Sequence, residues 1–154
     1  MTDEISRQDS ANQLESSLEK YGYLIRPIRG ISMLPLLEQE KDAVKIVPVK
    51  EQPLKKYDVP LYKRPNGSYV LHRILSVKEG YYVICGDNLF KKEKVPFEWV
   101  FGVMEGFFKS GKYVPCTDEQ YLKYAKKAAR QRPYREIKNL WQRVLRKMKK
   151  IIKR

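Results

Sequence analysis

The chain reads VPLYKRPNGSYVLHRILS from residue 59 to residue 76, and this stretch decides the fold class. Two strand-like runs, 59–64 and 68–76, lie on either side of Asn66-Gly67. An Asn-Gly pair between alternating apolar residues is the strongest short-range signal for a β-hairpin, because both residues accept the positive φ angles of a tight turn. The stretch therefore predicts two antiparallel strands joined by a turn.

Further β-strands are predicted on both sides of this hairpin. Val44 and Ile46 alternate with polar neighbours, and strand-like runs cover 80–85 and 98–108. Together with the hairpin, these runs predict a compact β body over residues 24–116. The predicted fold class is therefore mainly β.

The N-terminal end of the chain shows a helical pattern instead. Leu14, Leu18 and Tyr21 recur at helical spacing within 8–22, and Gly22 can end a helix there. We therefore expect a short helical segment within residues 1–23, before the β body.

The C-terminal end is also predicted to be helical. Either Thr117 or Asp118 can cap a first helix over 118–131, and Pro133 separates it from a second helix over 134–152. These two helices would make up a basic C-terminal region, 117–154.

Composition excludes several classes of protein. The 154 residues suit one domain, and they include a single histidine and only two cysteines, Cys85 and Cys116. A disulfide scaffold, a multi-cysteine zinc site and chemistry that needs several imidazoles are therefore excluded. The chain has no run of 18 apolar residues and a polar start, so we expect a cytoplasmic protein without a transmembrane helix or secretory signal.

Positive charge is concentrated at the C-terminal end. Residues 117–154 carry 14 basic and three acidic side chains, whereas residues 1–116 carry 18 basic and 15 acidic ones. In 134–152 an apolar stripe with helical spacing runs between the basic residues: Ile137, Trp141, Val144, Met148 and Ile151. Such a helix can lie in the interface of an anionic membrane, or its stripe can pack on the β body. Nucleic acid is a third, less favoured partner.

The first candidate for chemistry is Ser32, in the segment Arg29-Gly-Ile-Ser-Met-Leu-Pro-Leu-Leu37. Gly30 permits close backbone approach and Pro35 stiffens the chain downstream, as a nucleophilic serine on a tight turn requires. A serine that caps a helix is the alternative interpretation of this segment.

Two further segments add candidates. His72 lies on the outgoing strand of the hairpin, on the same face as Val70 and Ile74, so it is predicted to be buried and neutral near pH 7. The run Gly86-Asp87-Asn88 follows a predicted strand. Taken singly, a core histidine and an ordinary turn explain these two features.

In this order, the three segments resemble the superfamily of type I signal peptidases and LexA-type serine peptidases. The matching marks are Gly30-x-Ser32-Met33-x-Pro35-x-Leu37, His72-Arg73-Ile74 and Gly86-Asp87-Asn88, and the resemblance covers roughly residues 24–108. Most bacterial members use a Ser–Lys dyad, but one branch has histidine at the lysine position, followed by Arg and an aliphatic residue. His72-Arg73-Ile74 resembles that branch. The resemblance implies a coiled β-sheet body of the kind found in that superfamily.

The resemblance also implies roles for these residues. Ser32 would be the nucleophile, His72 the general base, and Asp87 the acid that orients it, with Glu93 as the alternative acid. Because Gly30 stands where signal peptidases often have a hydroxyl residue, the backbone N–H of Ser32 would be the oxyanion donor. We expect no membrane-spanning anchor of the kind that signal peptidases have, and the basic region could replace it. The resemblance implies no metal or organic cofactor.

The sequence therefore predicts a serine endopeptidase that cleaves a leader or precursor peptide through an acyl-enzyme. As the base, His72 would titrate near neutral pH, so activity would fall on acidification. The alternative is a non-catalytic β module that binds peptide, membrane or nucleic acid through its cleft and basic region. LexA-type repressors bind DNA through a domain ahead of the peptidase, and 23 residues are too few for one.

Overall fold

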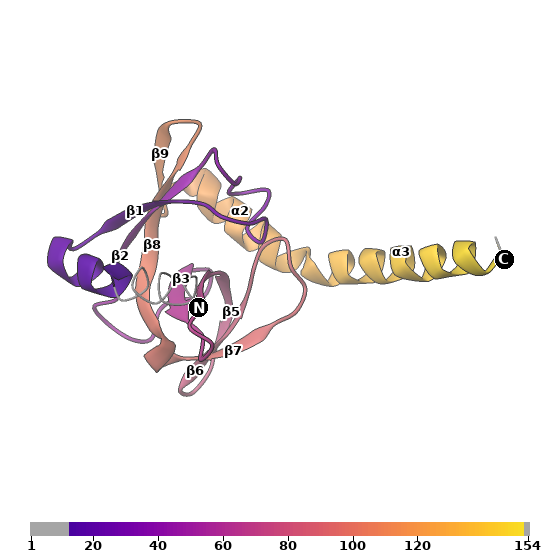
Figure 1. Ribbon diagram of the computed structural model, residues 1–154, viewed down its shortest axis with the longest axis horizontal. Helices are drawn as coiled ribbons and strands as arrows, with labels where there is room; N and C mark the ends of the chain where they lie inside the picture. The colour runs from indigo at the N-terminus through magenta and orange to yellow at the C-terminus, as the bar shows by residue number, and fades with distance from the viewer. Residues whose placement is uncertain (1–12, 153–154) are drawn as a thin grey trace, which may run out of the picture.

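The computed structural model describes residues 13–152, and its body is mainly β (Figure 1). One helix precedes the body, over residues 13–21, and two follow it, α2 (Glu119–Arg130) and α3 (Arg132–Ile152). The strands are β1 (Leu24–Pro27), β2 (Ala43–Pro48), β3 (Pro60–Lys63), β4 (Tyr69–Leu71), β5 (Arg73–Val77), β6 (Tyr81–Cys85), β7 (Glu93–Pro96), β8 (Val100–Lys109) and β9 (Lys112–Pro115).

These strands form two antiparallel sheets. The larger has the order β1-β2-β8-β3-β4, with β9 also paired to β8, and the smaller has the order β5-β6-β7. Strand β8 pairs with β2, β3 and β9, so it is the central strand of the larger sheet. A short 3-10 helix, Phe97–Trp99, precedes β8, where the sequence predicted that the strand had already begun.

The predicted hairpin is confirmed as the β3–β4 pair. Leu61 lies opposite Leu71 and Tyr62 opposite Val70. Gly67 takes a φ of 83°, and the Asn66 side chain accepts a hydrogen bond from the Ser68 N–H at 3.0 Å. Only Gly67 of the Asn-Gly pair has a positive φ. The Arg64 N–H donates to the Ser68 carbonyl and the Gly67 N–H to the Arg64 carbonyl, both at 2.9 Å, so a three-residue loop sets the register that leads to His72.

The outgoing strand is not continuous, contrary to the sequence prediction for 68–76. Strand β4 ends at Leu71 in the larger sheet and β5 starts at Arg73 in the smaller one, so His72 lies where the chain changes sheets. His72 is buried as predicted, at 4% exposure, but Arg73 is buried too, at 0%. The alternation of buried and exposed side chains breaks at these two residues because the chain passes from one sheet to the other.

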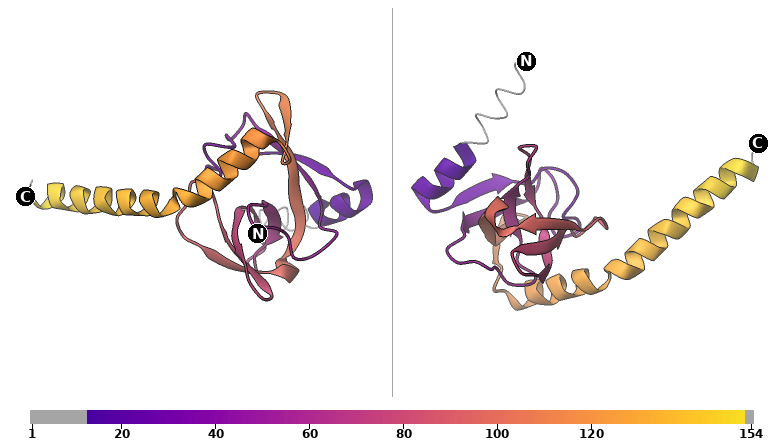
Figure 2. Two further views of the ribbon diagram at one scale, coloured as in Figure 1. Left: turned by 180° about the vertical axis from the view of Figure 1, so that it is seen from behind. Right: turned by 90° about the horizontal axis from the view of Figure 1, so that it is seen from below.

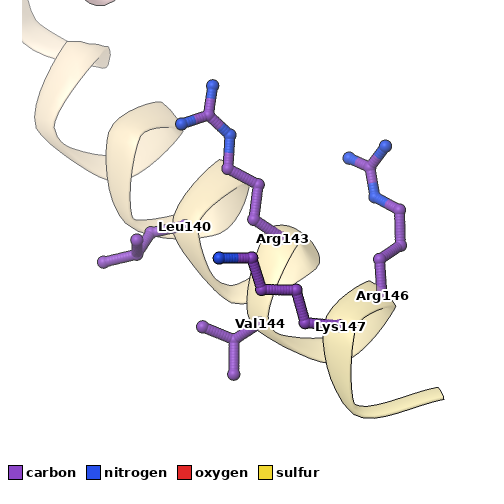
Figure 3. Close-up of a pocket in the computed structure, with 5 residues that line it drawn as sticks. All are labelled: Leu140, Arg143, Val144, Arg146 and Lys147. Atoms are coloured by element: carbon purple, nitrogen blue, oxygen red, sulfur yellow. The ribbon is translucent and has the colours of Figure 1, made fainter. Parts of the chain in front are cut away.

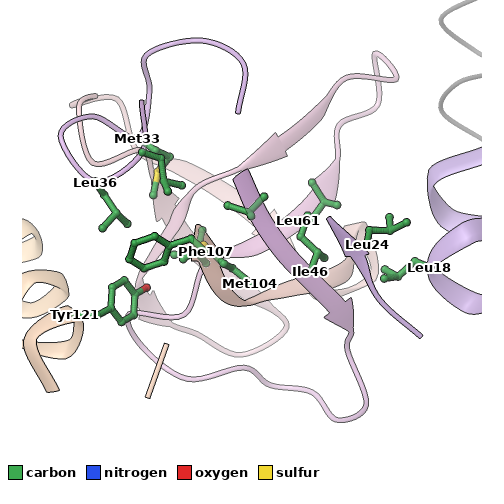
Figure 4. Packing of buried hydrophobic residues seen from close by; sticks show 12 residues of the cluster. Leu18, Leu24, Met33, Leu36, Ile46, Leu61, Met104, Phe107 and Tyr121 are labelled. Atoms are coloured by element: carbon green, nitrogen blue, oxygen red, sulfur yellow. The ribbon is translucent and has the colours of Figure 1, made fainter. Parts of the chain in front are cut away.

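Two clusters of apolar side chains form the core. The larger lies under β2, β3 and β8 and includes Met33, Leu37 and Tyr121, so the Ser32 segment and α2 both pack on it. Figure 4 shows Met33 and Leu36 near Phe107 at one end of this cluster and Leu18 near Leu24 at the other. The smaller cluster lies around β5, β6 and β7: Tyr62, Ile74, Tyr82, Ile84, Val95 and Val100.

The helix over 13–21 matches the described part of the predicted 8–22 helix, whose residues 8–12 lie outside the described chain. Leu18 is buried, but Tyr21, predicted on the same apolar face, is 62% exposed. Gly22 ends the helix with a φ of 74° and donates to the Leu18 carbonyl at 3.0 Å. Gly22 therefore supplies the left-handed conformation with which helices often end.

The two C-terminal helices lie close to their predicted bounds. Asp118 caps α2, and its side chain accepts a hydrogen bond from the Tyr121 N–H at 2.9 Å. Helix α3 runs on from α2 and away from the β body in both views of Figure 2. Between residues 13 and 152, none of the helices combines the length and apolar character needed to cross a bilayer.

Candidate active site

Ser32 lies on the connection between β1 and β2, above the larger core cluster. Its neighbour Met33 is 3% exposed and Leu37 is 0% exposed, so the core anchors the segment from below. Gly30, with a φ of 79°, donates its N–H to the Gln39 side chain at 2.8 Å. Ser32 itself is half-buried. The segment is therefore a fixed turn with the serine at its surface.

The run Gly86-Asp87-Asn88 holds this turn in place. The Asn88 N–H donates to the Ser32 carbonyl at 2.8 Å, and the Asn88 side-chain amide donates to the Ile31 carbonyl at 3.0 Å. Both contacts use backbone oxygens, which leaves the Ser32 hydroxyl uninvolved. Within residues 13–152, that hydroxyl makes no hydrogen bond.

Gly86 brings Ser32 and His72 to the same place. A Cβ atom added to Gly86 would lie 2.6 Å from the Ser32 carbonyl oxygen and 3.1 Å from the His72 Nε2 atom. No side chain fits there, so the glycine is required by the close approach of two segments rather than by its φ angle. The Ser32 carbonyl and the Nε2 edge of the imidazole therefore both lie against Gly86, but within residues 13–152 no hydrogen bond joins the Ser32 hydroxyl to His72.

The other ring nitrogen of His72 faces a polar cluster formed by Tyr62, Arg64 and Glu93. His72 Nδ1 lies 3.4 Å from the Tyr62 hydroxyl oxygen and 3.6 Å from the Glu93 Oε1 atom. The Tyr62 hydroxyl also donates to Glu93 Oε1 at 3.2 Å. The Nδ1 edge of the imidazole therefore lies beside a tyrosine hydroxyl and a carboxylate, and the Nε2 edge lies beside Gly86.

Arg64 keeps this carboxylate charged. Its Nε donates to Glu93 Oε2 at 2.9 Å, and a second guanidinium nitrogen contacts Glu93 Oε1. Burial opposes ionisation of Glu93, but the hydrogen bond and the charge of Arg64 outweigh it and lower the pKa of Glu93 below its usual value. A negative charge therefore stands beside His72 Nδ1 at physiological pH.

His72 is neutral under the same conditions. Burial lowers the pKa of His72 to about 4, and the nearby Glu93 charge only partly opposes that effect. This corrects the sequence-based expectation of a titration near neutral pH, which did not account for the depth of burial. A neutral imidazole can accept a proton from a hydroxyl at Nε2, as a general base must.

Asp87 lies in a hydrogen-bond network separate from the Glu93 cluster. Its carboxylate accepts two hydrogen bonds from Arg73, both at 2.8 Å, and a third from the Tyr124 hydroxyl at 3.0 Å. Arg73 also donates to the Tyr57 carbonyl and to the Tyr121 hydroxyl. Asp87 was the preferred candidate for the acid that orients His72, but the geometry favours the alternative, Glu93.

Sequence reasoning did not single out Tyr62, Arg64 or the Arg73 network. The hairpin register contained a signal for Tyr62, because it lies opposite Val70, two residues before His72 on the same face. Arg64 lies two residues after Tyr62, directly after β3. The burial of Arg73 had no comparable signal in the sequence.

The cysteines and acidic residues offer no competing chemistry in the described chain. Cys85 is buried, and burial raises the pKa of the half-buried Cys116 thiol to about 11, so it is not a ready nucleophile. Over residues 13–152, no group of three or more His, Cys, Asp or Glu side chains could hold a metal ion.

No protein-family model matches the chain, and no curated protein sequence matches it either.

Proposed function

We propose that the protein is a serine endopeptidase similar to the histidine-type signal peptidases, and that its β body is the coiled sheet of that superfamily. One observation carries the proposal. His72 is buried and neutral, its Nε2 edge and the Ser32 carbonyl both lie against Gly86, and its Nδ1 atom lies 3.6 Å from Glu93. A base placed between a serine and a carboxylate is the arrangement from which serine peptidases derive their nucleophile.

In the proposed reaction, His72 Nε2 takes the proton of the Ser32 hydroxyl as the oxygen attacks a peptide carbonyl carbon. The protonated imidazole then gives that proton to the leaving amine as the C–N bond breaks, which leaves an acyl group on Ser32. Water, deprotonated by His72, attacks this ester, and the proton returns to the Ser32 oxygen as the acid product leaves.

Glu93 and Arg64 would support the charged intermediate. Proton transfer makes His72 cationic in a buried place, which is costly unless a negative charge is near. Glu93 supplies that charge, and Arg64 fixes the position of the carboxylate. The Tyr62 hydroxyl, in contact with both Glu93 and His72, would hold the imidazole in the orientation that exposes Nε2.

The oxyanion that forms on the substrate carbonyl needs donors. The Ser32 backbone N–H is a suitable one, because it makes no hydrogen bond with other described residues. The proposed substrate is a leader or precursor peptide with small residues near the cleavage point, which follows from the resemblance alone. The chain has only two cysteines, too few for a disulfide scaffold, so we place the reaction in the cytoplasm.

Labelling with a fluorophosphonate probe tests the proposal without knowledge of the substrate. We expect the probe to modify Ser32, as mapped by mass spectrometry, and Ser32→Ala and His72→Asn to abolish this labelling. Ser76→Ala, a change at another partly buried serine, is the matched control and should label as the wild type does. Labelling at other serines, or labelling of Ser32 that is unchanged in His72→Asn, would favour the non-catalytic β module instead.

A further inference from the structure

Helix α3 carries an apolar face that nothing in the described chain covers. Its large apolar side chains are 41–63% exposed: Leu140, Trp141, Val144, Leu145 and Met148. They recur at intervals of one, three and four residues, so they share one side of the helix. The interpretation that this stripe packs on the β body is therefore wrong for these residues. The side chains of Ile137, Ile151 and Ile152 lie outside the described part.

The described side chains of α3 outside this apolar face are mostly basic. From residue 138 to 152 the chain contains no acidic side chain, and its basic residues are Lys138, Arg143, Arg146, Lys147, Lys149 and Lys150. Figure 3 shows Leu140 and Val144 on one side of α3, with Arg143 and Arg146 reaching out from another. Apolar and cationic surfaces thus lie along the same stretch of helix.

A second exposed apolar group lies beside Ser32. Ile31 is 62% exposed, and Leu89 and Phe90 are 38% and 37% exposed. Asn88 ties the loop that bears Leu89 and Phe90 to Ile31, through its side-chain hydrogen bond to the Ile31 carbonyl. We call these three residues the site rim.

Arg143 connects the site rim to α3. Its guanidinium lies 5.6 Å from the centroid of the Phe90 ring. The site rim therefore lies beside α3, on the side of the helix from which Arg143 extends.

We propose that α3 docks on the surface of an anionic bilayer, which holds the Ser32 site close to the membrane surface. Anionic lipid headgroups can pair with the cations while the apolar side chains enter the boundary of the acyl region. The docking does not depend on the peptidase activity, so either proposal can fail without the other.

Other occupants fit these observations less well. A second copy of α3 would bring two strongly positive surfaces together, which is unfavourable. Nucleic acid would neutralise the cations, but its phosphates would leave five large apolar side chains in contact with water. A bilayer surface satisfies both the charge and the apolar stripe.

Co-sedimentation of the full chain with vesicles tests the proposal. We expect binding to vesicles of phosphatidylcholine mixed with an equal amount of phosphatidylglycerol, much weaker binding to phosphatidylcholine alone, and loss of binding at high salt. Replacing three cations of α3 by glutamine (Arg146→Gln, Lys147→Gln, Lys149→Gln) should lower the partition constant by about a hundredfold.

A matched control places the same charge change on the β body, at exposed lysines remote in sequence from α3: Lys55→Gln, Lys56→Gln and Lys78→Gln. This variant should partition within a few-fold of the wild type. If both triple variants lose binding equally, general charge rather than α3 is responsible, and the proposal is overturned.

Tryptophan fluorescence tests the apolar stripe independently of charge. Trp141 is 63% exposed, so its emission should shift to the blue when it enters the interface. Trp141→Phe should remove that shift, since the other tryptophan, Trp99, packs against the smaller core cluster. Binding to duplex DNA without binding to anionic vesicles, or vesicle binding without a shift, would overturn the proposal. Labelling of Ser32 would be unaffected by either result.

Discussion

Two arginine–carboxylate pairs flank His72, and they differ in their access to solvent. The Arg73 and Asp87 side chains are 1% and 2% exposed, and Tyr121 and Tyr124 of α2 close over them. The Arg64 and Glu93 side chains are 34% and 23% exposed. We call them the sealed pair and the open pair. Both contain the same chemistry, but only the open pair touches an atom of the imidazole ring.

The difference in exposure indicates a structural role for the sealed pair and a role in proton transfer for the open pair. A sealed charge pair is weak evidence of added stability, but removal of one partner leaves a buried charge with no compensation. The sealed pair therefore ties α2 and β5 to the loop that supports Ser32. An open pair can adjust its charge and hydration cheaply, as a group that assists proton transfer must.

The largest expected effect comes from breaking the sealed pair. Asp87→Asn should lower the free energy of unfolding by about 3–5 kcal/mol, because Arg73 is left charged in a buried place. Urea unfolding measures this. Asp42→Asn is the control, since Asp42 is equally buried but pairs with Lys109, whose side chain is 39% exposed and can turn to water. An Asp87→Asn protein as stable as the wild type would show that the sealed pair has no structural role.

The pH dependence of stability tests whether His72, which lies between the two pairs, is buried as a neutral imidazole. The folded pKa of about 4 lies below the unfolded value of about 6.5, so between these pH values the unfolded chain binds the proton and the folded chain does not. The free energy of unfolding should fall by up to roughly 3 kcal/mol as the pH drops through this window.

His72→Gln should remove this part of the pH dependence, because the chain has only one histidine. The difference between wild type and variant, measured by urea unfolding at several pH values, isolates His72 from the carboxylates. The rate of Ser32 labelling should likewise fall near pH 4 rather than near pH 6.5. Equal pH profiles for the two proteins would contradict the burial of a neutral imidazole.

Breaking the open pair should change rate rather than stability. Glu93→Gln keeps the shape of the side chain but removes the charge beside His72 Nδ1, so Ser32 labelling should slow by at least about tenfold. The free energy of unfolding should change by no more than about 1 kcal/mol, as for a partly exposed pair. Unchanged labelling in Glu93→Gln, with a loss in the folded Asp87→Asn protein, would reassign the orienting role to Asp87.

The smallest expected effect is that of Tyr62→Phe. This change removes the hydroxyl that lies between Glu93 and His72 Nδ1 and leaves the aromatic ring in the core. One lost hydrogen bond should cost about 1 kcal/mol, or about fivefold in the labelling rate. A labelling rate equal to that of the wild type would mean that Glu93 orients the imidazole without Tyr62.

Much of the local structure followed from short-range patterns. Asn66-Gly67 predicted the hairpin, Asp118 was one of two predicted caps of α2, and Gly22 ended the first helix as expected. Each of these depends on residues within one turn or two adjacent strands. The burial of His72 was also predicted, from alternation with Val70 and Ile74, but in the structure His72 lies between β4 and β5, where that alternation breaks.

Where the pattern failed, contacts between distant residues were responsible. The buried Arg73 is explained by Asp87, 14 residues away, and by Tyr121, 48 residues away. The choice between Asp87 and Glu93 depended on which carboxylate Arg73 occupies. The degree to which the pKa of His72 falls depended on how deeply the two sheets bury it.

The sequence by itself determined the β body, its hairpin, the three helices and the residues available for chemistry, because turn geometry and side-chain periodicity are local properties. Only the tertiary structure decided how those residues are combined. It placed Gly86 between Ser32 and His72, gave Asp87 to Arg73 and Glu93 to the imidazole, and left the apolar face of α3 in solvent. These contacts depend on the close approach of distant chain segments and on the desolvation of charges, and the spacing of residues along the chain predicts neither.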